Sequence, residues 1–177
     1  RTTVREALQR LAREGLVLIL PRRGIVVSEI DVKRQLELLL LRREVERLMA
    51  SRAAQRASHS ERAQFRKIAL GMREAAKVND DVHFMRFDND LNGLLAKVCR
   101  NEYVRRAMAL MSGLSRRFWY RHYKEVSDLP LCARLHADLA DAIGSADASE
   151  AAKASDRLMD YVETFTRASL DAAPADG

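Results

Sequence analysis

The sequence has few residues that interrupt helices and no long apolar run. Its 177 residues include seven glycines and three prolines, and 47% of them are hydrophobic. This composition is typical of a strongly helical chain that is long enough to bury a substantial core. The best apolar run, Leu36 to Leu41, contains Glu37, whereas a membrane helix needs about 20 apolar residues. The sequence therefore predicts no membrane partner.

Cysteines and catalytic motifs are also scarce. The two cysteines, Cys99 and Cys132, are too isolated for a disulfide framework or a zinc ribbon and are typical of free thiols in a cytoplasmic protein. The chain has no Gly-rich phosphate loop, no Gly-x-Ser-x-Gly motif and no His-Glu-x-x-His motif, so we expect no enzyme. Asp88 with His136 could carry acid–base chemistry, which leaves a metal-assisted helical hydrolase as an alternative.

Positive charge is concentrated near the N-terminal end of the sequence. The net charge is +6, and residues 1–34 hold eight Lys or Arg against four Asp or Glu, while the remaining residues hold 23 against 21. A local basic excess of this kind predicts contact with nucleic acid. The alternative is a solvated basic face without a partner.

Residues 1–28 have the pattern of a helix followed by a β-hairpin. We expect Thr2 or Thr3 to cap the helix and Gly15 to end it. Two apolar runs, 16–20 and 25–28, flank Pro21-Arg22-Arg23-Gly24, which predicts two strands joined by a basic turn. The helical residues expected to face a core are Val4, Ala7, Leu8 and Leu11. A basic helix beside a basic hairpin is typical of the second half of a winged helix-turn-helix that binds DNA.

From Asp31 onward the sequence predicts one helix after another. The expected helices span residues 32–57, with a break near 38–41, then 58–78, 79–99, 102–125, 130–144 and 147–170. Capping boxes are predicted at Ser58 to Glu61 and at Asp147 to Glu150, and Asn101 is expected to close the third of these helices. The predicted fold class is mainly α: a partial winged helix-turn-helix over residues 1–30, an all-α antiparallel bundle over 31–170, and a loose tail over 171–177.

The segment Arg-Thr-Thr-Val-Arg-Glu-Ala-Leu-Gln-Arg-Leu-Ala-Arg-Glu-Gly-Leu-Val resembles part of the DNA-binding domain of GntR-type bacterial transcription regulators. The resemblance implies a preceding strand and two helices, on the order of 40 residues. It also implies which residues contact DNA: Arg1, Thr2, Thr3 and Arg5 on the helix, and Arg22, Arg23 and Gly24 on the wing.

The helical part resembles the FCD effector-binding domain of the FadR-like branch of the same regulators. The matching stretches are Arg42-Arg43-Glu44-Val45-Glu46 followed by Ala53-Ala54, then Asn101, and finally His136 to Ile143 with Asp147. Together, the two resemblances cover nearly the whole chain.

Three polar residues interrupt apolar stripes of the predicted bundle. Asp88 and Asn92 lie four apart on one helix face, and His136 shares a face with Leu139 and Ile143. Inward polar groups need partners. In the resembled family, residues at these positions and one further His bind a divalent metal. Here Asn92 and Leu158 stand where His is usual.

These departures leave two interpretations of the pocket. In one, Asp88, Asn92 and His136 hold a divalent metal of the Zn, Ni or Mn class, completed by water or by a chelating effector. In the other, His136 and an arginine bind an anionic effector directly. Arg42 is the first candidate, and the fourth predicted bundle helix offers Arg116, Arg117, Tyr120 and Tyr123.

The sequence thus leads to the hypothesis of a ligand-responsive transcription regulator. We expect a repressor that acts as a homodimer, binds a double-stranded DNA operator and senses a small organic acid. A bacterial cytoplasmic location at the nucleoid follows from the same hypothesis. A dimerisation module that does not bind DNA is a further alternative.

Overall fold

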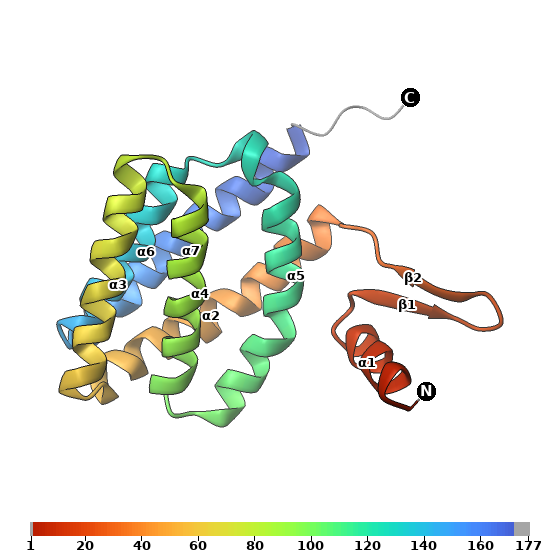
Figure 1. Ribbon diagram of the computed structural model, residues 1–177, viewed down its shortest axis with the longest axis horizontal. Helices are drawn as coiled ribbons and strands as arrows, with labels where there is room; N and C mark the ends of the chain where they lie inside the picture. Colours follow the sequence, from red (N-terminus) through yellow and green to blue (C-terminus); the bar gives the residue numbers. More distant parts are fainter. Residues whose placement is uncertain (1, 172–177) are drawn as a thin grey trace.

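The computed structural model describes residues 2–171 and confirms the predicted fold class: a basic helix and hairpin followed by a helical bundle (Figure 1). No helix among these residues has both the length and the apolarity needed to cross a bilayer. The elements are α1 (Thr2–Arg13), β1 (Val17–Leu20), β2 (Gly24–Val27), α2 (Val32–Arg56), α3 (His59–Lys77), α4 (Asp81–Val98), α5 (Glu102–Val126), α6 (Leu129–Gly144) and α7 (Ala148–Asp171).

Backbone hydrogen bonds at Gly15 end helix α1 as predicted. Gly15 has φ +74°, its N–H donates to the Ala12 carbonyl, and the Leu16 N–H donates to the Leu11 carbonyl. This pair of bonds is the Schellman motif, which favours glycine in the left-handed position. Thr3 lies inside α1 and therefore does not cap it.

The hairpin turn is tighter than the sequence suggested. The Arg23 N–H donates to the Leu20 carbonyl over 3.1 Å, and Arg22 has φ +61° after Pro21, a pattern typical of a type II turn. Gly24 pairs with Leu20 as the first residue of β2, so it belongs to the strand. Both strands leave most of their side chains exposed.

The apolar face of α1 does not lie in a core within the described residues. Val4 is 64% exposed, and Ala7 is exposed as well. The prediction that this stripe is covered is therefore not met in this chain. Val4 and Leu8 instead face Ile19 and Ile25 of the hairpin across an open groove.

Side-chain caps set the bounds of most bundle helices. Asp31 accepts hydrogen bonds from the first turn of α2, and the predicted capping box between Ser58 and Glu61 is present in full. Asn101, however, caps the start of α5 instead of closing α4. At α7 half of the predicted box forms: Asp147 accepts from the Glu150 N–H, and the Glu150 carboxylate pairs with an arginine. Helix α2 runs without the predicted break near 38–41.

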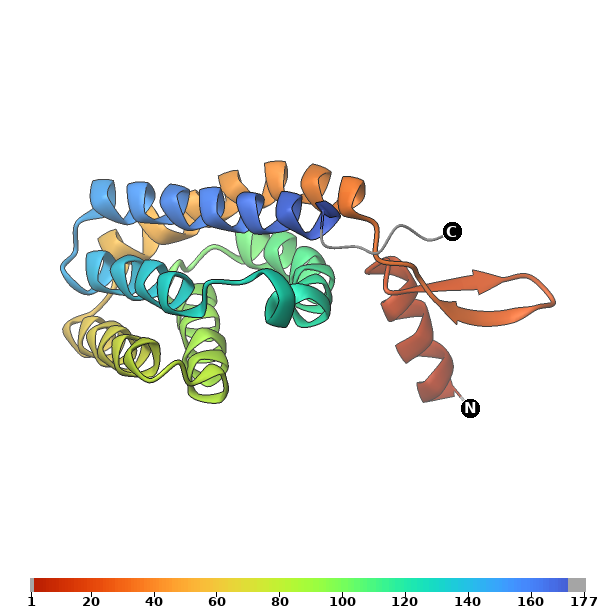
Figure 2. The ribbon, with the colours of Figure 1, turned by 90° about the horizontal axis from the view of Figure 1, so that it is seen from above.

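The bundle helices pack around one apolar core. Helices α2 and α7 lie side by side and antiparallel (Figures 1 and 2). Helix α6 packs against α7 on one face, and α3 and α4 cover its other face. Burying a large apolar side chain contributes about 1.5–3 kcal/mol. The largest fully buried apolar side chains are Phe65, Met72, Leu91, Ile143, Met159 and Val98. Helix α5 closes the end of the bundle that faces α1 and the hairpin (Figure 2).

Candidate functional site

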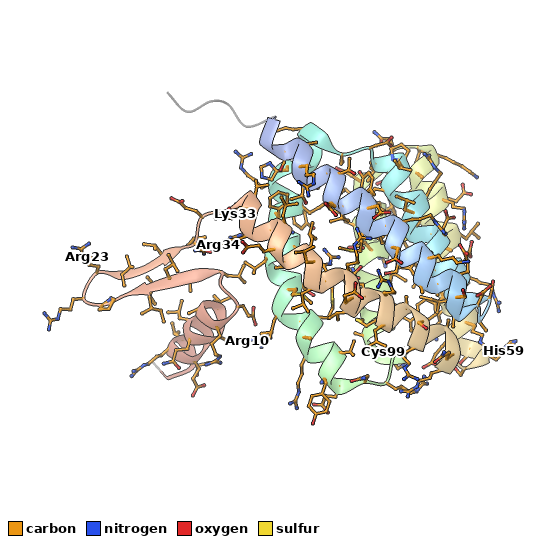
Figure 3. All side chains as sticks on the ribbon, turned by 180° about the vertical axis from the view of Figure 1, so that it is seen from behind. Arg10, Arg23, Lys33, Arg34, His59 and Cys99 are labelled. Atoms are coloured by element: carbon orange, nitrogen blue, oxygen red, sulfur yellow. The ribbon has the colours of Figure 1, made fainter. Side chains whose placement is uncertain are left out.

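The segment predicted to bind DNA projects away from the bundle. Thr3 and Arg5 are exposed on α1, and Arg22 and Arg23 are exposed at the hairpin turn. Figure 3 shows Arg23 at the hairpin tip and Arg10 on α1 of the same projecting segment. Gly24 follows the turn at the start of β2. Arg1 and the side chain of Thr2 lie outside the described part of the structure. Exposed arginines on such a protrusion can contact phosphates or a groove.

A polar cavity of about 270 Å³ lies inside the bundle. Helices α2, α4, α5, α6 and α7 each contribute residues to its walls. Six of the residues that the sequence proposed for effector binding line this one cavity: Arg42, Asp88, Asn92, Arg116, Tyr120 and His136. Arg117 and Tyr123 were also proposed but do not line it, and the Tyr123 hydroxyl instead donates to Asp81. A volume near 300 Å³ is at the lower end of the range for small-molecule pockets.

His136 and Asp88 form a charged pair in the wall of the cavity. The His136 Nε2 lies 3.3 Å from Asp88 Oδ1, and its Nδ1 donates to the Cys132 carbonyl over 2.8 Å. Burial would lower the pKa of His136, but Cys132 and Asp88 outweigh burial and raise the pKa well above its usual value. Nδ1 carries a proton because it donates to a carbonyl. Nε2 faces the Asp88 carboxylate, and this contact is favourable when Nε2 is protonated too, so that the ring is an imidazolium.

The surrounding charges keep Asp88 ionised. Burial would raise the pKa of the Asp88 carboxyl, but His136, Arg42 and Arg116 together lower it below its usual value. Arg42 also donates from Nε to Glu46 Oε1 over 2.6 Å, with both side chains largely buried. Arg116 contacts the Asn89 side-chain oxygen at 3.4 Å. With His136 protonated, these groups comprise three cations and two anions, so the cluster complements one negative charge.

The donor set does not fit a resident divalent metal. Asp88 and His136 are brought together, but Asn92 donates its amide to Asp88 Oδ1 over 3.1 Å, and an amide is a weaker donor to a transition metal than the usual imidazole. Leu158, at the position of the missing imidazole, is 3% exposed and apolar. No group of three or more His, Cys, Asp or Glu side chains suited to a metal occurs in residues 2–171. Transition metals prefer more and stronger donors than this.

A second chamber adjoins the first. It has a volume of about 340 Å³ and shares Arg42, Asn92 and His136 with the polar cavity. Leu158 lines this second chamber together with other apolar side chains. The substitution of leucine for the expected histidine therefore leaves an apolar recess next to the charged cluster.

Sequence reasoning missed several polar residues of the cavity, among them Gln35 and Ser115. Gln35 is 6% exposed and lines the cavity from the first turns of α2. It stands seven residues before Arg42, two helical turns away on the same face, and that spacing could have identified it. Ser115 lines the cavity from α5, and its Oγ is buried without a hydrogen-bond partner in the described structure.

Helix α5 also joins the bundle to the DNA-binding segment. Arg117 points away from the cavity: its Nη1 donates to the Ser28 carbonyl over 2.9 Å, and its Nη2 donates to the Glu29 carbonyl over 3.1 Å. The sequence had offered Arg117 for the pocket, and the structure corrects this. One turn earlier, a Cβ on Gly113 would lie 3.1 Å from the Leu16 side chain. The same helix therefore carries cavity residues on one face and hairpin contacts on another.

A basic helix and hairpin that project from a bundle with an internal polar cavity define a transcription regulator with its own ligand-binding domain. Residues 37–161 match the FCD domain, and residues 1–27 match the bacterial regulatory proteins of the gntR family. The chain belongs to the GntR family of transcription regulators that carry an FCD domain, and this assignment makes it a regulator and not an enzyme.

Named relatives agree with this assignment. The chain is 24% identical over 167 residues to the HTH-type transcriptional repressor RspR of Escherichia coli K12, covering 94% of this chain and 73% of RspR. A Shigella flexneri protein named as the uncharacterized HTH-type regulator YdfH gives the same values. Among solved structures, E. coli McbR/YncC is similar in fold, with a TM-score of 0.72 and 16% identity over 96% of this chain and 81% of that one.

Proposed function

We propose that this regulator is a DNA-binding repressor that dissociates from its operator when it binds a small organic acid. GntR regulators bind DNA operators, and FCD domains bind small-molecule effectors. The observation that carries the finer proposal is the charged cluster of Arg42, Asp88 and His136, which complements one negative charge inside the bundle. A carboxylate is the monoanion that an arginine fork and an imidazolium recognise best.

In this proposal the effector binds the protein directly, without a resident metal. The effector carboxylate competes with Glu46 for the Arg42 guanidinium and accepts a hydrogen bond from the protonated ring of His136. Because Asp88 already pairs with His136, a bound carboxylate changes the pairing in the cluster, and we propose that α4, α6 and α2 shift relative to one another in response. An effector can shift this arrangement only through a difference in affinity between its two states.

The rearrangement reaches DNA through α5. Arg116 of the cavity is followed directly by Arg117, which holds the linker between hairpin and bundle through the Ser28 and Glu29 carbonyls. We propose a homodimer in which each basic segment reads one half of a near-palindromic operator, because a two-fold dimer fixes the half-site spacing. A change in linker geometry then changes the distance between the two recognition helices.

The decisive experiment titrates full-length protein against its upstream DNA with and without candidate organic acids. We expect Arg42→Ala and His136→Ala to bind DNA like the wild type but to resist release, with an effector concentration for half-release raised at least about tenfold per lost charged contact. Arg134→Ala, on the same helix as His136 and exposed, is the matched control. If the acid releases both variants from DNA as readily as it releases the wild type, the pocket assignment is wrong. If the wild type does not bind its upstream DNA at all, that DNA does not contain the proposed operator.

A further inference from the structure

The cavity has a second polar end whose hydrogen-bonding groups are unused by the protein. The Ser115 Oγ is buried and lacks a hydrogen-bond partner among the described residues. Gln35 is 6% exposed, and its side-chain amide takes part in none of the hydrogen bonds found within residues 2–171. Both residues line the same cavity as His136. Buried polar atoms in native proteins are nearly always paired, and an exception calls for a missing partner; of these two residues, Ser115 has such a buried atom.

This end is separate from the charged cluster. Gln35 and Arg42 are seven residues apart on α2, which places their backbones about 10 Å apart along the helix. Arg42 and His136 also line the second chamber, whereas Gln35 and Ser115, like Asp88 and Arg116 of the cluster, line only the first. The position of Gln35 near the start of α2 therefore places it away from Arg42 and from the apolar recess.

Aromatic side chains make up part of the cavity wall. Phe118, Trp119 and Phe165 contribute to it, and the Trp119 and Phe165 rings lie 4.7 Å apart between centroids. The charged residues that line the cavity, Arg42, Asp88, Arg116 and His136, belong to the cluster around Asp88. The end at Gln35 and Ser115 thus offers hydrogen bonds without charge.

We infer that Gln35 and Ser115 form a distal subsite for an uncharged hydrogen-bonding group, so that the effector is a carboxylic acid with a hydroxyl or carbonyl at its far end. This inference rests on the proposed function, which supplies the carboxylate at Arg42. An amide and a hydroxyl can each donate and accept, which suits an uncharged oxygen group. The aromatic walls suit an apolar body between the two ends.

The subsite also lies next to the route toward DNA. Gln35 follows the α2 cap Asp31 by one turn, and Ser115 precedes the linker-binding residue Arg117 by two positions. A ligand that bonds to both residues therefore ties the start of α2 to α5 at the junction with the hairpin.

The test uses calorimetric titration of the full chain with matched carboxylates that differ in the distal group. The pairs are hexanoate with 6-hydroxyhexanoate, and 3-phenylpropanoate with 3-(4-hydroxyphenyl)propanoate. In at least one pair we expect the hydroxylated acid to bind about tenfold tighter, as a good additional hydrogen bond allows. In Gln35→Leu with Ser115→Ala this advantage should disappear, while the affinity for the unhydroxylated acid stays the same.

Two further measurements separate the possible failures. Gln55→Leu, the same change at an exposed position of α2, should keep the discrimination. In the absence of ligand, Gln35→Leu should not lower the thermal midpoint, since the amide makes no bond to lose. Equal binding within every pair, failure of every pair to bind, or discrimination that survives in the double variant would overturn the distal subsite. The effect of Arg42→Ala on the release of DNA by an organic acid tests the carboxylate site separately from the distal subsite.

Discussion

The projecting DNA-binding segment and the helical bundle solve opposite physical problems. In the bundle, Phe65 and Ile143 are fully buried, and the functional groups face inward around a cavity. In the projecting segment, Val4 and Val27 are 64% and 73% exposed, and Arg5, Arg22 and Arg23, which are predicted to contact DNA, are exposed as well. The two regions therefore present their polar groups differently: the bundle around a cavity, and the projecting segment on an accessible basic surface.

The two regions should differ most in how they respond to loss of an apolar side chain. Phe65→Ala removes a ring from the centre of the bundle and should lower the free energy of unfolding by about 3–5 kcal/mol. Val27→Ala, on an exposed strand, should change it by no more than about 0.5 kcal/mol. Urea unfolding followed by circular dichroism measures both. Similar losses for the two variants would contradict the contrast in packing.

Loss of positive charge should affect DNA binding more in the projecting segment than in the bundle. Replacing Arg22 and Arg23 together with alanine removes two cations from the hairpin tip (Figure 3), so operator affinity should fall by about 1–3 kcal/mol per contact and the salt dependence should weaken by about two ion equivalents. The matched control is Lys67→Ala with Lys97→Ala, two exposed cations of the bundle. DNA titrations at several salt concentrations decide, and an equal effect of the two double variants would place the DNA contact elsewhere.

The junction between the regions can be broken with a single side chain. Arg117→Ala removes charged hydrogen bonds to the Ser28 and Glu29 carbonyls, each worth about 1.5–3 kcal/mol. We expect residues 16–31 to exchange their amide hydrogens at least about tenfold faster, while the core of α3 stays protected. Hydrogen–deuterium exchange measures this. Arg121→Ala, one turn further along α5 and exposed, is the control, and unchanged protection in Arg117→Ala would show that the arginine does not hold the linker.

Much of this architecture could be predicted from local sequence signals. Capping residues act on the helical turn next to them, so Ser58, Asp31 and Gly15 set helix ends that can be identified without tertiary information. The expected break in α2 was wrong because its leucines and arginines are strong helix formers. Leu40 and Leu41 are simply exposed, at 71% and 58%.

The cavity was predictable in part, for a related reason. Apolar periodicity identifies the inward face of a single helix, so Asp88 and His136 could be recognised as inward polar residues. Periodicity does not say which other helix that face meets. The direction of Arg117 and the lack of a partner for Ser115 depend on how α5 packs between the hairpin and α2, and those contacts are long-range.

The smallest expected effect is the pH dependence of the free energy of unfolding. It should come from the pair of His136 and Asp88 in the bundle and not from the exposed arginines of the projecting segment. The folded state raises the pKa of His136 above 6.5, so the stability from its pairing is complete below about pH 6.5 and is lost as the pH rises through the folded-state pKa. The folded state lowers the pKa of Asp88, so its stability is lost only as the pH falls through that lower value. Arg42 and Glu46 from α2 and Arg116 from α5 are the other charged groups near this pair.

The wild type should therefore become less stable as the pH rises from 6 toward 9, and an organic acid should bind more weakly over the same interval because the ring of His136 loses its charge. His136→Gln should flatten both dependences. His59→Gln, an exposed histidine at the start of α3, should leave them intact. Chemical unfolding and acid titrations at a series of pH values measure the two slopes. If the slopes survive in His136→Gln, the pair with Asp88 is not the group that links the interior of the bundle to pH.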